Sequence, residues 1–379
     1  MKIYDVAIVG SGPSGAATAF YLAQKGIRVC IIEKETLPRY KTCGGGFVFR
    51  GRKNLPIDVS EVVEREFYDV ETFFGKDLHF TVSREEPIIT MIMRDTFDHL
   101  IVKKAQELGV DLLEGHKLIK VDSQNNYIIS ETTQGKIQSK FLIAADGVLS
   151  PTAKLAGWTT ETRNLIPALE YEVTVSKEDF ERLSKTVRFD IDGAPQGYAW
   201  CFPKKSHLSI GVLTTKKKRI NLKEYYKEYL DLLGIKDIIK EEMHGFQIPL
   251  SSRTDGFTKG RTFLIGDSAG FAEPITAEGI SNAIYSGKLV AEAIIESNLD
   301  LGVATKLYEE KLHEKLVPEL RSGEFLMAYF YKKNPLRSFL FKKYGQRFGE
   351  FMVDILMGDK TFPVNVKKKL AQKIKEAVF

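Results

Sequence analysis

Residues 4–34, YDVAIVGSGPSGAATAFYLAQKGIRVCIIEK, constrain the fold more than any other stretch of the chain. An apolar run over 6–9 predicts a buried strand, and Gly10, Gly12 and Gly15 follow it in a G-x-G-x-x-G pattern that opens a small-residue helix. The first glycine permits a tight turn, the second lets the backbone approach a pyrophosphate, and the third lets helix and strand pack closely. A second strand over 28–32 ends at Glu33, whose carboxylate can accept hydrogen bonds from ribose hydroxyls. The stretch therefore predicts a dinucleotide-binding unit.

Two alternatives stay open at this point. A glycine-rich turn in a doubly wound fold can bind nothing, although that does not explain an acid at the end of the second strand. The motif also does not distinguish FAD from NAD. Besides the residues named above, we predict cofactor contacts at Pro13, Ser14 and Lys34.

Bulk composition indicates a globular enzyme-sized protein. The chain has 379 residues, of which 43% are hydrophobic, enough for two subdomains. No apolar run is long enough to span a membrane, and the N-terminus enters a strand directly, so we expect neither a membrane span nor a signal peptide. Three cysteines at unrelated positions form neither a disulfide framework nor a zinc spacing, so we predict no metal site and a reducing, cytoplasmic setting.

Positive charge is concentrated at the C-terminus. Residues 301–379 contain 16 Lys and Arg against 9 Asp and Glu, whereas the whole chain carries only +5. A basic, aromatic-rich region suggests peripheral contact with an anionic membrane surface, and the alternative is a solvated helical face. Nucleic acid is not expected as a partner, because no nucleic-acid-binding motif accompanies the charge.

The segment after Glu33, LPRYKTCGGGF, predicts a loop rather than a regular element. Its glycines, Gly44 to Gly46, allow backbone to lie flat against a planar ligand. We place Cys43 beside the cofactor for this reason. The alternative is an inert, buried cysteine.

Several polar residues fall at strand ends, where open sheets bind ligands. Arg94 lies at a strand-to-helix junction, where a cation can meet a phosphate or a flavin edge; the alternative is a surface arginine. Asp146 and Gly147 follow a buried strand over 141–145, and Asp267 follows another over 261–265. Gly279 precedes a helix over about 280–295, whose free N–H groups suit an anion.

The middle of the chain reads as a β-rich block over 165–215, followed by a charged amphipathic helix pair over 222–244. Within the segment GYAWCFPKK, Tyr198, Trp200 and Phe202 are spaced by two and share one face of a strand. They could line an apolar substrate pocket over a flat cofactor. The alternative is an ordinary sandwich core.

Four features in fixed order carry a family resemblance: the glycine motif with Glu33, Arg94 before a helix, AADG at 144–147, and GDSAGFAEPITAEGIS at 266–281. Together they resemble FAD-dependent oxidoreductases of the para-hydroxybenzoate hydroxylase fold. Within that group, KTCGGG at 41–46 and GYAWCFPK at 197–204 resemble the geranylgeranyl reductase family. The resemblance covers about residues 3–300, and the C-terminal region matches weakly.

The resemblance implies roles for individual residues. The glycines of the first motif and Glu33 would hold the pyrophosphate and adenosine ribose of FAD. Arg94 and Asp267 would contact the ribityl and phosphate portion. Gly279 and Ile280 would direct N–H groups at the flavin pyrimidine ring, where reduced flavin is negatively charged. Cys43, Gly44 and Gly46 would line the flavin, Cys43 being a candidate catalytic residue, and the three aromatic residues would line the substrate cavity.

The resemblance also implies an α/β fold with three parts. A discontinuous Rossmann-type FAD-binding domain is expected at 1–75, 94–160 and 258–300, an antiparallel β-sheet substrate domain at 76–93 and 161–257, and a helical basic region at 301–379. The implied function is hydrogenation of isoprenoid C=C bonds by hydride transfer from reduced flavin. Because no second glycine motif occurs at a strand–helix junction, the donor must be an external NAD(P)H or a reduced protein such as ferredoxin. A flavin monooxygenase or halogenase and a non-catalytic prenyl-binding escort are the alternatives.

Overall fold

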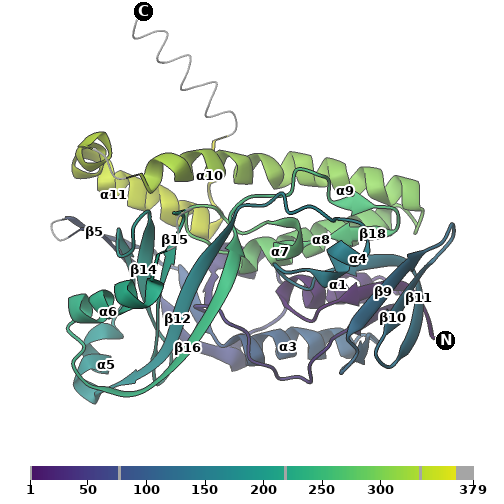
Figure 1. Ribbon diagram of the computed structural model, residues 1–379, viewed down its shortest axis with the longest axis horizontal. Coiled ribbons are helices and arrows are strands. Elements are labelled where there is room, and N and C mark those ends of the chain that lie inside the picture. Colours follow the sequence, from purple (N-terminus) through teal and green to yellow (C-terminus); the bar gives the residue numbers. More distant parts are fainter. Residues whose placement is uncertain (1, 76–77, 217–219, 333–334, 364–379) are drawn as a thin grey trace, which may run out of the picture.

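The computed structural model describes residues 2–75, 78–216, 220–332 and 335–363. It confirms the predicted α/β fold, with a mainly parallel sheet, a mainly antiparallel sheet and C-terminal helices that lie along the top of the view, above both sheets (Figure 1). A small meander adjoins the first sheet, because β9 (Leu118–Ser123) and β10 (Ile128–Thr132) pair antiparallel with each other and β10 pairs antiparallel with β11 (Gly135–Ala144).

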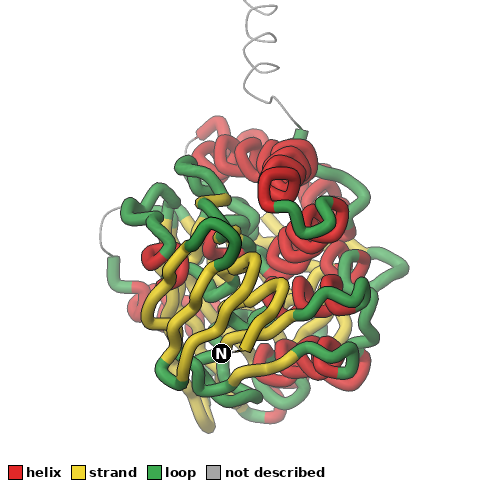
Figure 2. Tube along the Cα trace, turned by 90° about the vertical axis from the view of Figure 1, so that its right-hand side faces the viewer, coloured by secondary structure: helices red, strands yellow, loops and turns green. Residues whose placement is uncertain are grey.

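The first sheet has the order β17-β18-β11-β1-β2-β8, and β10 and β9 continue from β11. Its central strands are parallel. Along the first strand, Val6 and Ile8 face the helices while Ala7 and Val9 face the meander, so both faces are buried. Figure 2 shows these strands in yellow with helices in red beside them. The strand bounds are β1 (Lys2–Val9), β2 (Val29–Ile32), β8 (Asp111–Leu113), β9 (Leu118–Ser123), β10 (Ile128–Thr132), β11 (Gly135–Ala144), β17 (Thr258–Lys259) and β18 (Thr262–Leu264).

The helices on this sheet pack side by side, with α1 between α3 and α8, and α9 against α8. Alanines of α1 are fully buried, so the helix can lie close to its neighbours. The bounds are α1 (Pro13–Ala23), α3 (Arg94–Gln106), α8 (Ile280–Glu296) and α9 (Leu301–Lys315), with the short helices α4 (Pro151–Leu155) and α7 (Gly266–Ala269) at strand ends.

The second sheet has the order β16-β12-β15-β14-β13-β5-β6, and all its pairs are antiparallel except β5 with β13. One face packs against α5 and α6, and the other faces the first domain and the C-terminal helices. The bounds are β5 (Asp69–Phe74), β6 (Leu78–Ser83), β12 (Leu165–Val175), α5 (Lys177–Leu183), β13 (Val187–Ile191), β14 (Gly197–Pro203), β15 (Leu208–Thr214), α6 (Leu222–Leu233) and β16 (Ile238–Pro249).

The predicted start of the β-rich domain at residue 76 is wrong. Strand β5 already pairs with β13, so the chain enters the second sheet by Asp69. A small third sheet precedes this crossing and has the order β3-β7-β4. Its bounds, with those of the short helices beside it, are β3 (Gly46–Val48), α2 (Phe49–Lys53), η1 (Ser60–Val62), β4 (Val63–Phe67) and β7 (Ile89–Ile92).

The predicted helix pair over 222–244 is also wrong in its second half. Only α6 is helical, and Ile238–Pro249 forms the edge strand β16, which pairs with β12 along its whole length. Its charged, exposed side chains follow from that position, because charge protects the free edge of a sheet from pairing with other chains.

The described part of the C-terminal region up to Met357 is mainly helical, as predicted. Its first helix, however, belongs to the FAD-binding domain, because Ala304, Tyr308 and Leu312 of α9 lie in that domain's core. The later helices, α10 (Val317–Phe330) and α11 (Pro335–Met357), pack against the second sheet. None of the described helices combines the length and apolarity needed to cross a membrane. The basic residues after 363 lie outside the described residues.

Candidate active site

The glycine turn adopts the close packing that its spacing predicts. Gly10 has φ +104°, and a Cβ there would lie 2.5 Å from the carbonyl oxygen of Ala145. A Cβ on Gly15 would lie 2.1 Å from the Gly10 oxygen, so neither position accepts a side chain. Gly12 is the N-cap of α1 and makes no side-chain hydrogen bond there. A Cβ on Gly12 would lie 3.7 Å from Arg94 Nη2 and 4.0 Å from Arg39 Nη2.

These two arginines form a cationic site at the start of α1. Arg94 Nε and Nη2 donate to the carboxylate of Asp98 at 2.8 and 2.9 Å, and Arg39 Nη1 donates to the same carboxylate at 3.0 Å. Burial disfavours the charged form of Arg94, but Asp98 outweighs it and raises the pKa of the guanidinium. Arg39 Nε also lies 3.8 Å from Glu33 Oε2, so the two arginines face two carboxylates. Their guanidinium groups lie beside the N-terminus of α1, a position that fits the pyrophosphate of FAD.

Glu33 lies at the end of β2, as predicted, but it is already engaged. Its Oε2 accepts hydrogen bonds from the backbone N–H and hydroxyl of Ser11 at 3.0 and 2.5 Å, and Oε1 accepts from the N–H of Glu35 at 3.0 Å. These bonds orient the carboxylate at the mouth of the glycine turn. Lys34, also predicted as a contact, is exposed and forms an ion pair with Glu35 at 3.4 Å.

The predicted residues from the distant C-terminal part of the domain reach the same place. A Cβ on Gly279 would lie 3.4 Å from Asp267 Oδ1, so these two residues are brought together. Burial raises the pKa of Asp267, and Lys41, Arg94 and Arg163 oppose that shift. At the start of α8, Glu278 accepts a hydrogen bond from the N–H of Ser281 at 2.7 Å, so a side chain of the protein itself caps the turn predicted to face the flavin.

Asp146 and Gly147 lie in the turn that leads into α4. The Asp146 carboxylate accepts from the hydroxyl of Ser150 at 2.6 Å and from the N–H of Thr152 at 2.8 Å, which fixes the start of α4. Both of its oxygens are therefore used within this turn. Gly147 has φ +79°, which glycine adopts without strain.

The loop over residues 40–46 runs across one face of the second sheet. At the β16 edge, the Tyr40 ring lies 4.2 Å from His244, and Lys41 Nζ lies 3.7 Å above the Phe246 ring. At the β14 end, a Cβ on Gly44 would lie 3.1 Å from Phe202 and 3.2 Å from Trp200 Nε1. The predicted glycine loop and aromatic strand are thus in direct contact.

A buried lysine fixes this loop. Lys204 is 0% exposed, and its Nζ donates to the carbonyls of Gly44 at 2.6 Å and Ile92 at 3.0 Å. Gly45 has φ +69°, and a Cβ there would lie 2.1 Å from this ammonium and 2.2 Å from the Ile92 oxygen. Cys43, in the same loop, lies near Arg94, and its Sγ accepts a hydrogen bond from the N–H of Gly45 at 3.4 Å.

The three predicted aromatic residues share one face of β14 and are buried there. Their rings form a row, 5.9 Å from Tyr198 to Trp200 and 6.1 Å from Trp200 to Phe202. The same cluster includes core residues of α10 and α11, so this row also contributes to packing. Trp200 Nε1 is buried and has no hydrogen-bond partner among the described residues, which marks a polar atom left for a ligand beside Gly44.

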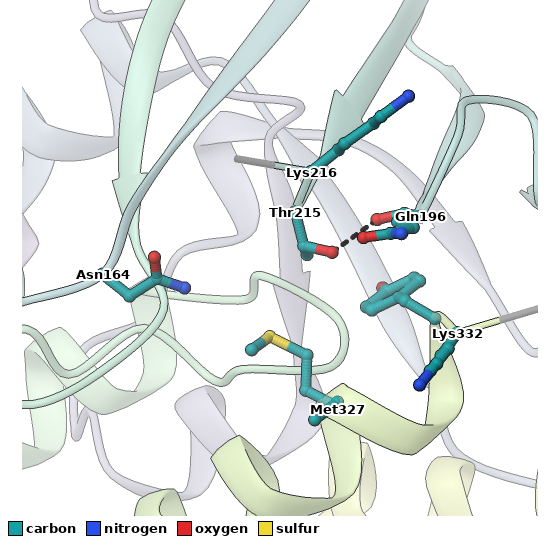
Figure 3. Close-up of a pocket in the computed structure, with 8 residues that line it drawn as sticks. Asn164, Gln196, Thr215, Lys216, Met327 and Lys332 are labelled. Atoms are coloured by element: carbon teal, nitrogen blue, oxygen red, sulfur yellow. Dashed lines mark hydrogen bonds between the residues drawn. The ribbon is translucent and has the colours of Figure 1, made fainter. Parts of the chain in front are cut away.

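An open cavity of about 490 Å³ lies at the far end of this row. Tyr331 lines it, and the Tyr331 ring is 6.4 Å from that of Tyr198. Figure 3 shows its other walls, which come from the ends of β12, β14 and β15 and from the C-terminal end of α10. They include Asn164, Gln196, Thr215, Lys216, Met327 and Lys332.

Sequence reasoning missed four of the residues that build this site. Ser11 lies inside the glycine motif and Arg39 inside the loop, but only the fold shows their partners. Asp98 lies one helical turn after Arg94, a spacing that favours an ion pair and could have identified it. Lys204 ends the GYAWCFPK segment, where a lysine is ordinarily a solvated residue.

Comparison with known proteins agrees with this geometry. Residues 58–297 match the family described as FAD binding domain, and residues 5–65 match the family described as FAD dependent oxidoreductase. The chain belongs to the FAD-binding-domain family. It is an FAD-dependent oxidoreductase, and the residues of the glycine turn, the arginine pair and the Asp267 turn fit that cofactor.

Relatives confirm the predicted resemblance to geranylgeranyl reductases. The chloroplastic geranylgeranyl diphosphate reductase of Arabidopsis thaliana is 29% identical, covering 88% of this chain and 75% of that protein. Digeranylgeranylglycerophospholipid reductase 1 of Methanococcoides burtonii is 26% identical, covering 86% of this chain and 84% of that protein. A geranylgeranyl bacteriochlorophyll reductase-like structure from Thermoplasma acidophilum has a TM-score of 0.74 at 22% identity, covering 98% of this chain and 96% of that one.

The fold is shared with other flavin chemistry. The flavin-dependent brominase Bmp2 has a TM-score of 0.73 at 20% identity, with 99% of both chains covered. The fold therefore does not select the reaction. That choice depends on the sheet face and the loop above it.

Proposed function

We propose that this oxidoreductase hydrogenates isolated C=C bonds of an isoprenoid chain on a lipid, quinone or diphosphate. The observation that carries the proposal is the contact of Trp200 and Phe202 with Gly44, which sets an apolar aromatic wall against the predicted flavin-facing loop. Bound FAD, once reduced, supplies a hydride. An unactivated alkene offers no charge to recognise, so the protein's own contribution is to orient the chain and exclude water.

We propose that the isoprenoid chain runs along the aromatic row. The row leads from Phe202, under the loop, through Tyr198 to Tyr331 and the open cavity. We place the distal part of the substrate in that cavity, whose wall includes Met327. A bulky Met327→Trp substitution should raise KM for a long-chain substrate more than for a short one, because only the long chain reaches the cavity.

A surface beside the cavity suits a lipid-borne substrate. Exposed apolar and aromatic side chains alternate with lysines in the sequence at the end of α10 and along α11, and we call these residues the α10–α11 patch: Tyr329, Lys332, Phe339, Leu340, Lys342, Lys343 and Tyr344. Aromatic residues interleaved with cations suit the headgroup region of an anionic bilayer. Lys332 belongs both to the patch and to the cavity wall, so a lipid taken up at the patch would enter beside the cavity.

Vesicle binding tests the patch. The double substitution Phe339→Ser with Leu340→Ser should weaken binding to phosphatidylglycerol vesicles, and raised salt should weaken binding of the unaltered protein. Ile239→Ser is the matched control, because Ile239 is 70% exposed on the edge strand away from the patch. Equal binding of both variants would remove the patch from the proposal.

Electrons must reach FAD from outside the chain. We propose transient docking of NAD(P)H or of a reduced protein such as ferredoxin, since the sequence holds no second glycine motif at a strand–helix junction. Each donor should be tested anaerobically for reduction of the bound FAD, monitored as loss of the oxidised flavin absorbance. The donor that reduces FAD is the one that the protein uses.

The decisive experiment is anaerobic turnover. The FAD-loaded protein is reduced with dithionite and mixed with a geranylgeranyl glycerophospholipid, geranylgeranyl diphosphate or a prenylated quinone. Flavin reoxidation together with a product that has gained hydrogen across a C=C bond supports the proposal. Reaction only with oxygen, giving a hydroxylated or halogenated product, would support the monooxygenase or halogenase that the brominase-like fold allows. Lipid binding without FAD uptake would support a prenyl-binding escort.

A further inference from the structure

A group of buried ionisable side chains lies under the Cys43–Gly46 loop and has no role in the function proposed above. At its centre is Glu170 on β12, which is 2% exposed. Its Oε1 accepts a hydrogen bond from the hydroxyl of Ser209 at 2.7 Å, and the backbone N–H of Cys43 approaches the carboxyl from the loop. Its Oε2 is buried and has no hydrogen-bond partner among the described residues. A buried carboxyl oxygen without a partner gains a hydrogen bond if it is protonated and donates that proton to a bound ligand.

Glu170 lies close to the predicted reacting region. Across the sheet, Trp200 pairs with Gly211, and Gly211 pairs with Glu170. Gly211 has no side chain to separate them, and a Cβ there would lie 2.1 Å from the Trp200 ring. Trp200 Nε1 in turn approaches Gly44. The unpartnered atoms of Trp200 and Glu170 therefore belong to neighbouring positions on the face that the loop covers.

The surroundings favour the protonated form of Glu170. Burial, followed by the charge of Glu172 on the same strand, raises the pKa of Glu170 to about 7. Lys204 opposes this shift from the end of β14, and Ser209 does so from β15. The other titratable groups that face the carboxyl are Cys43 and Tyr40 on the loop, His207 beside β15, and Glu242 and His244 on β16.

We propose that Glu170 is the proton donor of the reaction, holding at Oε2 the proton that the alkene receives. The inference rests on the proposed hydrogenation. One alkene carbon takes the hydride and the other takes the proton, so the π bond breaks, two C–H bonds form, the alkene is reduced and the cofactor is oxidised. Glu170 is left as a carboxylate. It regains its proton from solvent before the next turnover.

The first test needs no substrate. Infrared difference spectra of the FAD-loaded protein should be recorded across neutral pH. The band of a protonated carboxyl should disappear as pH rises, following the titration curve of a single group. That band should be missing in Glu170→Gln and retained in Glu241→Gln, a matched change of an exposed carboxyl on the neighbouring strand; Glu241 pairs with Val173, which lies on the opposite face of the sheet. Other buried carboxyls contribute to the spectra of both variants, so the comparison isolates Glu170. A titrating band that is unchanged in Glu170→Gln would overturn the inference.

The second test measures the proton transfer. At neutral pH, reoxidation of the reduced protein by an isoprenoid substrate should slow about 10²-fold in Glu170→Gln, the usual contribution of a general acid. FAD affinity and reduction by dithionite should not change, and Glu241→Gln should react like the unaltered protein. The unaltered protein should also lose rate as pH rises past neutrality, and this dependence should vanish in Glu170→Gln.

The two hypotheses fail in different ways. If the unaltered protein reduces no isoprenoid, the proposed function is overturned and the inference falls with it. If the unaltered protein reduces the isoprenoid and Glu170→Gln does so at the same rate and with the same pH dependence, the inference alone is overturned.

Discussion

Replacing Glu170 by Gln should change the pH dependence of stability in a direction that burial fixes. Glu170 has an ordinary pKa of 4.5, which is raised to about 7 in the folded chain. The folded protein therefore keeps a proton that the unfolded chain has released, so the contribution of Glu170 to stability is present below its unfolded pKa and is lost as pH rises to its folded pKa. Each unit of pKa shift corresponds to about 1.4 kcal/mol, so the full cost is about 3 kcal/mol.

The glutamine of the Glu170→Gln variant keeps the shape of the side chain and the bond to Ser209 but does not titrate. The free energy of unfolding of the variant, relative to the unaltered protein, should rise by up to about 3 kcal/mol from about pH 4.5 to about pH 7 and then level off. Urea denaturation at a series of pH values, at fixed FAD concentration, measures this difference. Histidines titrate in the same range, but both proteins contain them, so their effect largely cancels. Parallel stability curves for the two proteins would refute the reasoning.

Three further substitutions test the framework of the site. Gly45→Ala should lower the free energy of unfolding by about 2 kcal/mol or more, because a Cβ there meets buried backbone. The control Gly26→Ala has a similar φ of +72° and open space around it, so it should lower the free energy of unfolding by only about 1 kcal/mol. Equal losses for the two variants in urea denaturation would contradict the close approach at Gly45. Asp98→Asn should destabilise the FAD-free protein by about 3 kcal/mol, since two arginines lose their shared carboxylate, and added FAD should restore part of that loss in thermal unfolding. Lys204→Met leaves two buried carbonyls unpaired, so FAD should bind about tenfold more weakly by fluorescence titration, and unchanged affinity would exclude a role in positioning the loop.

The parts of the fold that are predictable from sequence are those that local pattern determines. The glycine turn requires close contact at Gly10 and Gly15, and no other residue type satisfies it, so its spacing identifies the structure directly. The face shared by the three aromatic residues follows from the period of a strand. The edge strand β16 resembles a helix in sequence because its charged residues lack alternation, and its conformation is fixed by pairing with β12 rather than by its own sequence.

The candidate site is harder to predict because its polar residues derive their roles from distant partners. Arg39 looks like a loop cation until the fold brings it to Asp98, and Lys204 looks solvated until two carbonyls surround it. Asp146 shows the reverse case. Its place after a parallel strand is typical of a ligand site, but both of its oxygens serve the start of α4. Burial and hydrogen-bond partners, which sequence spacing does not encode, separate these cases.

The distribution of charge along the 39–46 segment explains how one fold can serve different flavin reactions. Arg39, at its start, belongs to the arginine pair at the glycine turn, which we expect to hold the pyrophosphate that FAD carries in every FAD enzyme. Gly44 contacts the aromatic sheet face, which concerns the substrate. Changing the residues on the sheet side should therefore alter which substrate reacts, whereas changing those on the helix side should weaken FAD binding. The proposed reductase function therefore depends on Cys43, Glu170 and Trp200, and exchanging these for a brominase's residues should change the reaction before it weakens FAD binding.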